Sequence, residues 1–170
     1  MTTIVEGIVA RPRSLDCPDS AFRDDHHILA YRRLSEARSG ARIVPFDDSS
    51  RIVFFSDCHR GDGSRADAFA KNAELFLQAL THYYHAGFTY IEVGDGDELW
   101  QNRRFSAVRQ AYGHIFDLLH EFDLQSRLHL IVGNHDIQGN RRDPVEKDSL
   151  VAHEGLLLRH ARSGHKPVSY

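Results

Sequence analysis

The chain has 170 residues, of which 41% are hydrophobic and 26% charged, and its formal net charge is −3. This composition is ordinary for a globular domain and excludes collagen-like, disordered and disulfide-scaffold proteins. Because there is no global positive charge, we expect no stable nucleic-acid partner. Cys17 and Cys58 are too few for a disulfide framework and predict a reducing, cytoplasmic setting. No apolar run approaches the ~20 residues that a transmembrane segment needs.

The first fifty residues predict an N-terminal extension. Residues 4–18 have no sustained hydrophobic period and contain two prolines. From Phe22 to Arg38 the apolar positions predict a short helix, which Ser39-Gly40 breaks. A polar turn at residues 45–50 precedes the next apolar run. We therefore expect an extension over residues 1–50 and a main domain over residues 51–170.

From residue 51 onward, apolar strands alternate with amphipathic helices. Residues 51–56, 89–93 and 128–132 are short apolar runs, typical of buried strands. Apolar side chains repeat with a helical period over residues 66–86 and 105–122, so we expect one helix between each pair of strands. This order predicts an α/β fold with right-handed βαβαβ connections and a mainly parallel sheet.

Each of these strands ends in a cluster of polar residues. Asp57 and His59 follow the first strand, Asp95 follows the second, and Asn134 and His135 follow the third. Ligands of open α/β sheets bind beyond the carboxyl ends of the strands, so we expect these side chains to converge. Carboxylate, imidazole and amide groups suit Mn²⁺, Fe²⁺ or Zn²⁺. Two such ions roughly 3.5–4 Å apart can clamp a phosphoryl oxygen and activate a water molecule, with Asp95 on the middle motif as the expected bridge.

The same residues carry a resemblance to a known family. Asp-x-His at 57–59, Gly-Asp-x-x-Glu at 94–98 and Gly-Asn-His-Asp at 133–136 resemble the motifs of the calcineurin-like metallophosphoesterases. The resemblance covers residues 51–136, about half of the chain. Trp100 extends the second motif to Gly-Asp-x-x-Glu-x-Trp, which is similar to the UDP-diacylglucosamine hydrolase branch of that family.

The resemblance implies an activity and a role for each residue. The activity is hydrolysis, by a metal-activated hydroxide, of a phosphomonoester, a phosphodiester or a nucleotide-linked pyrophosphate. The substrate would be a phosphorylated small molecule or a nucleotide-linked compound. Asp57 and His59 would hold one metal ion, Asp95 would bridge the two ions, and Asn134 would bind the second. Asn134 and His135 would stabilise the transition state, with His135 facing the substrate; Mn²⁺ is the first choice for both ions, and Fe²⁺ or Zn²⁺ are the alternatives.

The chain departs from the family pattern after the third motif. The family continues with a His-Gly strand end and a Gly-His-x-His element, which complete both metal shells and the second sheet. Here Gly164-His165 is followed by Lys166 and Pro167. We therefore expect the later ligands to be missing and residues 51–170 to be the first half of a metallophosphoesterase-type α/β sandwich, incomplete at the C-terminus. An alternative hypothesis is an incomplete or non-catalytic module that needs a partner or a missing C-terminal segment.

Other polar residues are expected to lie outside the metal shell. Glu98 is expected to cap or orient a ligand, Asp97 to be solvated, and Cys58 to pack in the interior. Two further histidines could approach a metal, and two arginine pairs could either grip a substrate phosphate or lie on the solvated surface. These residues are His153, His160, Arg103-Arg104 and Arg141-Arg142.

Residues 61–66 also match G-x-G-x-x-A, a dinucleotide-binding pattern. In that pattern the loop is small and uncharged, whereas Arg60 and Asp62 crowd this turn together with the strand-end residues. Glu92 could supply the acidic residue expected at the end of the second strand, but the neighbouring Asp95 is better explained by the metal motif. We therefore reject a nicotinamide or flavin site.

Overall fold

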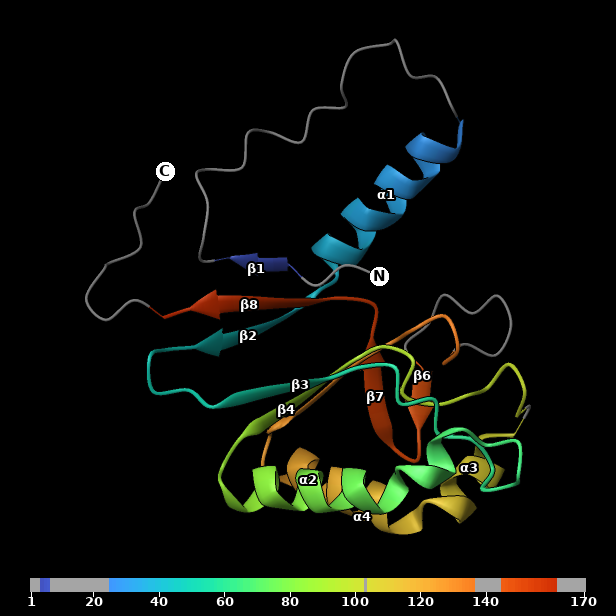
Figure 1. The fold of residues 1–170 in the computed structure, drawn as a ribbon. Helices are drawn as coiled ribbons and strands as arrows, with labels where there is room; N and C mark the ends of the chain where they lie inside the picture. The colour runs from blue at the N-terminus through green and yellow to red at the C-terminus, as the bar shows by residue number, and fades with distance from the viewer. Residues whose placement is uncertain (1–3, 7–24, 103, 137–144, 162–170) are drawn as a thin grey trace, which may run out of the picture. The chain divides into compact units, whose positions relative to one another are not determined.

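The computed structural model describes residues 4–6, 25–102, 104–136 and 145–161 (Figure 1). The chain divides into two compact units: residues 51–154 form one, and residues 2–50 with 155–170 form the other. Each unit contains one sheet, and the strands of both sheets are mainly parallel. The predicted α/β fold with a mainly parallel sheet is therefore confirmed. Among the described residues, no helix is both long enough and apolar enough to cross a membrane.

The unit of residues 51–154 is built on a five-stranded sheet with the order β3-β4-β5-β7-β6. The three predicted strands are neighbours in it: β3 (Ile52–Phe55), β4 (Thr89–Val93) and β5 (Leu128–Ile131). They pair in parallel, and β7 (Leu150–His153) continues the parallel order, whereas β6 (Val145–Lys147) pairs with β7 in antiparallel fashion. The carboxyl ends of β3, β4 and β5 therefore lie at the same edge of the sheet.

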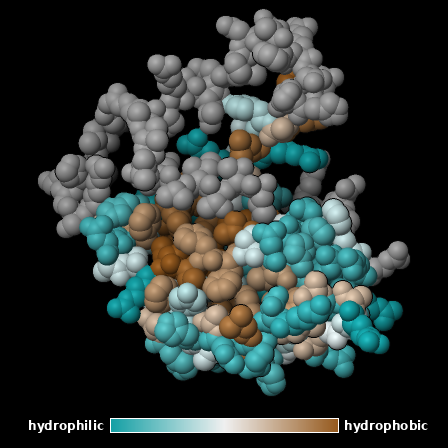
Figure 2. All heavy atoms as spheres, viewed as in Figure 1, coloured by the Kyte–Doolittle hydropathy of each residue, from teal (hydrophilic) through white to brown (hydrophobic). Residues whose placement is uncertain are grey.

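Helices lie along one face of this sheet (Figure 1). They are α2 (Ala73–His85), between β3 and β4 in the sequence, and α3 (Phe105–Ala111) and α4 (Gly113–Leu124), between β4 and β5. Between sheet and helices lies one apolar core, whose most deeply buried members include Leu80, Tyr90, Phe116, Leu119 and Phe122. On the face shown in Figure 2, apolar residues reach the surface at the level of the strands, and mostly hydrophilic residues lie over the helices below them.

Both predicted helices are interrupted for local reasons. At the start of the first, the Asp67 carboxylate accepts hydrogen bonds from the N–H groups of Gly63 and Phe69, and this bonding competes with a helix. Phe69–Lys71 form only a 3₁₀ turn, and α2 begins at Ala73. The second predicted helix breaks between α3 and α4 at Tyr112, where φ is −121° and ψ is 38°.

The described residues of the other unit form a three-stranded parallel sheet and one helix. The sheet has the order β1-β8-β2, from Ile4–Glu6, Leu156–His160 and Arg42–Phe46, and the helix is α1 (Asp25–Ser39). The predicted domain boundaries differ from this arrangement, because they assign residues 155–170 to the domain that begins at residue 51. The physical reason is strand pairing: β8 lies between β1 and β2, so the segment after residue 154 belongs with the first fifty residues.

Candidate metal centre

Backbone hydrogen bonds join the loops that follow β3, β4 and β5. The N–H of His59 donates to the carbonyl of Asp95 at 2.9 Å, which ties the first loop to the second. The N–H of Leu99 donates to the carbonyl of His135 at 3.0 Å, which ties the second loop to the third. The three loops that carry the predicted site residues are therefore held against one another, as the parallel strand order requires.

Three of the predicted metal ligands come together at this edge. Asp57, His59 and Asp95 each offer one donor atom, and these three atoms lie within 4.8 Å of one another. His59 Nε2 is 3.9 Å from Asp57 Oδ1, and the Asp57 side chain is 71% exposed, so the cluster opens to solvent. Two carboxylates and one imidazole form a donor set that fits Mn²⁺, Fe²⁺ or Zn²⁺.

The same three residues have a left-handed backbone conformation. Asp57, His59 and Asp95 have φ angles of 54°, 50° and 52°, in the left-handed region that non-glycine residues rarely adopt. Asp and His adopt this region more readily than most residues, and Ser126, Asp148 and Ser149, which lie outside the cluster, adopt it as well. The three donors therefore come from loop segments that follow β3 and β4 rather than from the regular strands themselves.

Close backbone approach requires glycine in the second and third motifs. A Cβ atom on Gly133 would lie 2.0 Å from Asp95 Oδ1 and 2.1 Å from Asp95 N. A Cβ atom on Gly96 would lie 1.9 Å from Glu92 Oε1. Any side chain at these positions would displace Asp95 or Glu92, which explains the two glycines in physical terms.

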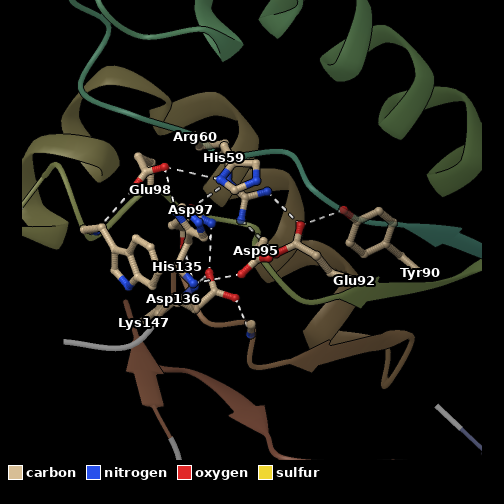
Figure 3. Close-up of polar contacts among 12 residues, drawn as sticks. His59, Arg60, Tyr90, Glu92, Asp95, Asp97, Glu98, His135, Asp136 and Lys147 are labelled. Atoms are coloured by element: carbon tan, nitrogen blue, oxygen red, sulfur yellow. Dashed lines mark hydrogen bonds and ion pairs between the residues drawn. The ribbon is translucent and has the colours of Figure 1, made fainter. Parts of the chain in front are cut away.

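The third loop contributes the two remaining predicted residues. The N–H of His135 donates to Asp95 Oδ1 at 2.8 Å, so this loop fixes the carboxylate expected to bridge two ions. His135 itself is half-buried beside the cluster, and its ring lies edge-on to that of His59 with 4.5 Å between centroids (Figure 3). Asn134 lies between Gly133 and His135 on this loop and is exposed.

Glu98 contacts both histidines of the site. Its Oε2 lies 2.8 Å from His135 Nδ1 and 3.3 Å from His59 Nδ1, and the three side chains form a second group of potential metal donors (Figure 3). Oε1 accepts the N–H groups of Trp100 and Gln101. Burial would raise the pKa of Glu98, but the hydrogen bond from His135 and the backbone donors outweigh burial and lower it. These contacts agree with the orienting role expected for Glu98.

His59 retains unused bonding capacity. Its Nδ1 is buried and makes no hydrogen bond among the residues that the structure describes, although the Glu98 carboxylate is near. A buried imidazole nitrogen without a hydrogen-bond partner costs free energy. This atom therefore has capacity for a further polar partner at the site.

Trp100 covers one face of His135. The two rings are stacked, with 4.1 Å between centroids and an interplanar angle of 23°, while Trp100 remains 61% exposed. Trp100 is the single tryptophan of the chain. Its indole therefore marks the solvent side of His135 and gives the site an intrinsic fluorescent reporter.

Beneath the three loops lies a buried network of charged residues that sequence reasoning did not identify. Arg60 donates from Nη1 and Nη2 to the Glu92 carboxylate at 2.7 and 2.8 Å, and from Nε to Asp97 at 2.8 Å (Figure 3). The Tyr90 hydroxyl donates to Glu92 at 2.8 Å. Because Glu92 is occupied in this way and α2 begins only at Ala73, the structure supports rejecting the dinucleotide pattern.

Asp97 is a correction to the sequence analysis. It is predicted to be solvated, yet its exposed fraction is 0%. Burial alone would raise its pKa, but the charges of Arg60 and Lys147 outweigh burial and lower it, so the carboxylate stays ionised. The sequence places three acidic residues within 95–98 and a basic residue, Arg60, directly after the first motif, but Lys147, on β6, could not be connected to them.

The other residues singled out in the sequence have varied positions. Cys58 is half-buried against the core, and burial, followed by the nearby Glu92 carboxylate, raises its pKa to about 12. His153 is half-buried on β7, and His160 pairs with Asp48 in the other unit, with Nε2 3.0 Å from Oδ1. Arg104 is exposed, while Arg103, Arg141-Arg142, Gly164-His165 and Lys166-Pro167 lie outside the described residues.

Comparison with known proteins adds no assignment. No protein-family model, no curated protein and no solved structure matches the chain. The functional interpretation therefore stands on the strand-end motifs and on the geometry of the cluster.

Proposed function

We propose that this chain is a metal-dependent phosphoesterase of the calcineurin-like metallophosphoesterase type. The observation that carries the proposal is the group of donor atoms of Asp57, His59 and Asp95, all within 4.8 Å at the carboxyl edge of a parallel sheet. The order of the three motifs along the chain supports the same conclusion.

The residues of the cluster would hold divalent metal ions, with Mn²⁺ as the first choice. Asp57 and His59 are the proposed ligands of one ion, Asp95 the bridge, and Asn134 a ligand of the second. When bound, the ions supply Lewis-acid chemistry: they lower the pKa of a water molecule and neutralise charge on phosphoryl oxygens. The contribution of the chain is to fix these donors through the backbone bonds between the three loops.

His135 is the proposed proton donor to the leaving oxygen. Its Nδ1 is engaged by Glu98 at 2.8 Å, which leaves Nε2 for a substrate oxygen. A carboxylate on Nδ1 fixes the orientation of the imidazole and favours a proton on that nitrogen, so His135 gives a proton from Nε2 only as the doubly protonated imidazolium, which the Glu98 carboxylate also stabilises. Trp100, stacked on the ring, further restricts its rotation. Glu98 and Trp100 are in this account positioning residues for His135.

The proposed substrates are phosphomonoesters, phosphodiesters or nucleotide-linked pyrophosphates, as the resemblance implies. The acidic and imidazole groups at the edge of the sheet suit a phosphate that arrives with metal ions, because the ions offset the repulsion between phosphate and carboxylates. The proposed substrate is therefore a phosphorylated small molecule of the cytoplasm whose phosphate binds together with divalent metal ions.

The test is metal-dependent hydrolysis by wild-type protein and an Asp95→Asn variant. Asparagine keeps the shape of the side chain and tolerates a positive φ, so the backbone conformation at residue 95 is retained. We expect wild-type protein with Mn²⁺ to hydrolyse p-nitrophenyl phosphate or bis-p-nitrophenyl phosphate, and the variant and the EDTA-treated protein to lose this activity. Asp123→Asn, at an exposed position on α4, is the matched control and should retain it. Equal turnover by the Asp95→Asn variant and wild type would contradict the proposal.

A further inference from the structure

We propose that Lys147, on β6, is a positioning residue that sets the spacing of the metal-binding loops through Asp97 and Asp136. The inference rests on the proposed function and adds to it a residue that no motif contains. Lys147 lies on β6, a different strand from the three that carry the motifs. Its Nζ donates to Asp97 on the second loop and to Asp136 on the third.

Lys147 is the cation between two buried carboxylates. Its Nζ lies 2.6 Å from Asp97 Oδ2 and 2.5 Å from Asp136 Oδ1, and its side chain is only 5% exposed. The two acidic residues are themselves in contact, because the N–H of Asp97 donates to Asp136 Oδ1 at 2.8 Å. Two carboxylates held this close in the interior repel each other unless a cation separates them. Lys147 therefore allows the second and third loops to stay together.

The two carboxylates sit directly beside the site residues in the chain. Asp97 lies between Asp95 and Glu98, and Asp136 follows His135. Asp136 also accepts the N–H of Gly133 through Oδ2 at 2.8 Å, which closes the turn of the third loop. A shift of either carboxylate would move a metal ligand or His135, and misplacement on the scale of 1 Å is enough to weaken a metal site or slow a reaction.

The network also reaches the first loop. Arg60, adjacent to His59, donates to Asp97 Oδ1 while Lys147 binds Asp97 Oδ2 (Figure 3). The charges in the chain Glu92–Arg60–Asp97–Lys147–Asp136 alternate in sign, and all five residues are buried. One residue of this buried network thus lies on each of the three ligand-bearing loops. Arg60 is on the first, Asp97 on the second and Asp136 on the third.

A control residue lies next to the same hairpin. Arg109 on α3 pairs with Asp148, which follows Lys147 in the turn between β6 and β7, and with Asp117 at 2.7 Å. Arg109→Met removes the ion pair with Asp148 in the hairpin, and the pair with Asp117 on α4, but leaves the contacts of Lys147 with Asp97 and Asp136 in place. It therefore separates loss of hairpin stability from loss of loop spacing.

The experiment compares Lys147→Met, Lys147→Arg and Arg109→Met with the wild type after circular dichroism has shown that each is folded. The first readout is the emission maximum of Trp100 without metal, because this ring stacks on His135. The second is the dissociation constant for Mn²⁺, measured from the electron paramagnetic resonance signal of the free ion. If Lys147→Met does not fold, Lys147→Met/Asp136→Asn, which removes the uncompensated carboxylate charge, takes its place.

We expect the Lys147→Met protein, or the double variant, to shift the Trp100 emission and to bind Mn²⁺ at least tenfold more weakly. Arg109→Met should match wild type in emission and bind Mn²⁺ within twofold of it, and Lys147→Arg should recover part of the loss. Wild-type emission and affinity in the Lys147 variants, or equal losses in the Arg109 and Lys147 variants, would overturn the proposal. If wild-type protein binds no Mn²⁺, the proposed function fails, while the metal-free emission still decides the role of Lys147.

Discussion

Glu98 Oε2 lies 2.8 Å from Nδ1 of His135, and this contact links the second motif to the third across 37 positions of sequence. The carboxylate is almost buried, with a side-chain exposure of 12%, and its other oxygen accepts two backbone N–H groups. It is therefore fixed before any ligand arrives. An imidazole held by such a carboxylate points its other nitrogen, Nε2, in a defined direction, and it can give a proton there when the ring is doubly protonated.

Replacing Glu98 with glutamine should reduce turnover more than substrate binding. Glutamine keeps the length of the side chain but loses the negative charge that orients His135. We expect kcat for p-nitrophenyl phosphate with Mn²⁺ to fall by roughly 10–100-fold, the effect typical of such orienting partners, with KM changed much less. Glu121→Gln, at an exposed position on α4, is the control. Unchanged kcat in Glu98→Gln would show that His135 does not depend on this carboxylate.

Gly133→Ala should damage the site through a steric clash with Asp95. The new Cβ would approach Asp95 Oδ1 to 2.0 Å and Asp95 N to 2.1 Å, so the loop that carries Asp95 must move. We expect weaker Mn²⁺ binding together with lower thermal stability, measured by titration and by melting.

Gly87→Ala is the matched comparison for that substitution. Gly87 has a φ of 77°, but among the described residues no atom beyond its chain neighbours lies within 4 Å of its Cβ position. Alanine there costs about 1 kcal/mol of backbone strain and should leave Mn²⁺ affinity unchanged. If both variants bound Mn²⁺ as tightly as wild type, the close approach of Gly133 to Asp95 would not be needed for metal binding.

Acid should weaken the attachment of the β6–β7 turn through Asp148. Burial raises the pKa of this carboxyl, but the hydrogen bonds from His120 and Arg109 outweigh burial and lower it below 3.8. A carboxyl with a lowered pKa stabilises the folded state above its unfolded pKa, and the contribution is lost as the pH falls through the folded value. Asp148→Asn should therefore reduce the free energy of unfolding at pH 7, by an amount of order 1 kcal/mol for such partly exposed pairs, and the difference should shrink below pH 3.8.

Urea unfolding of wild type and Asp148→Asn between pH 2.5 and 7 measures this difference. Asparagine is well suited to the test because Asp148 has a φ of 54°, which asparagine tolerates. A difference that stays constant down to pH 2.5 would mean that the charge of Asp148 contributes nothing to stability.

The three motif-bearing strands could be predicted from sequence because each is a short apolar run that ends in polar residues. Their parallel order then brought Asp57, His59 and Asp95 together, and the structure has these donor atoms within 4.8 Å. The breaks at residue 72 and at Tyr112 could not be predicted from periodicity, because the buried positions keep their helical spacing on both sides of each break. Near these breaks, Asp67 accepts hydrogen bonds from the N–H groups of Gly63 and Phe69 and from the Tyr112 hydroxyl, contacts that no periodicity reveals.

The buried charges could not be found for a different reason. An aspartate is usually solvated, and the burial of Asp97 is compensated by its ion pairs with Arg60 and Lys147. Lys147 is separated from Asp97 by 50 positions, and neither spacing nor motif relates them. The β8 strand likewise pairs with β1 and β2, which are far from it in sequence. Spacing along the chain therefore does not show that β8 belongs to the other unit.

The central claim is that Asp57, His59 and Asp95 bind a divalent metal ion, and Mn²⁺ binding to wild type and Asp95→Asn tests it most directly. The free Mn²⁺ signal in electron paramagnetic resonance gives both the affinity and the number of ions per chain. We predict saturable binding by wild type and loss of tight binding in Asp95→Asn. No saturable binding by wild type, or equal binding by both proteins, would contradict the account.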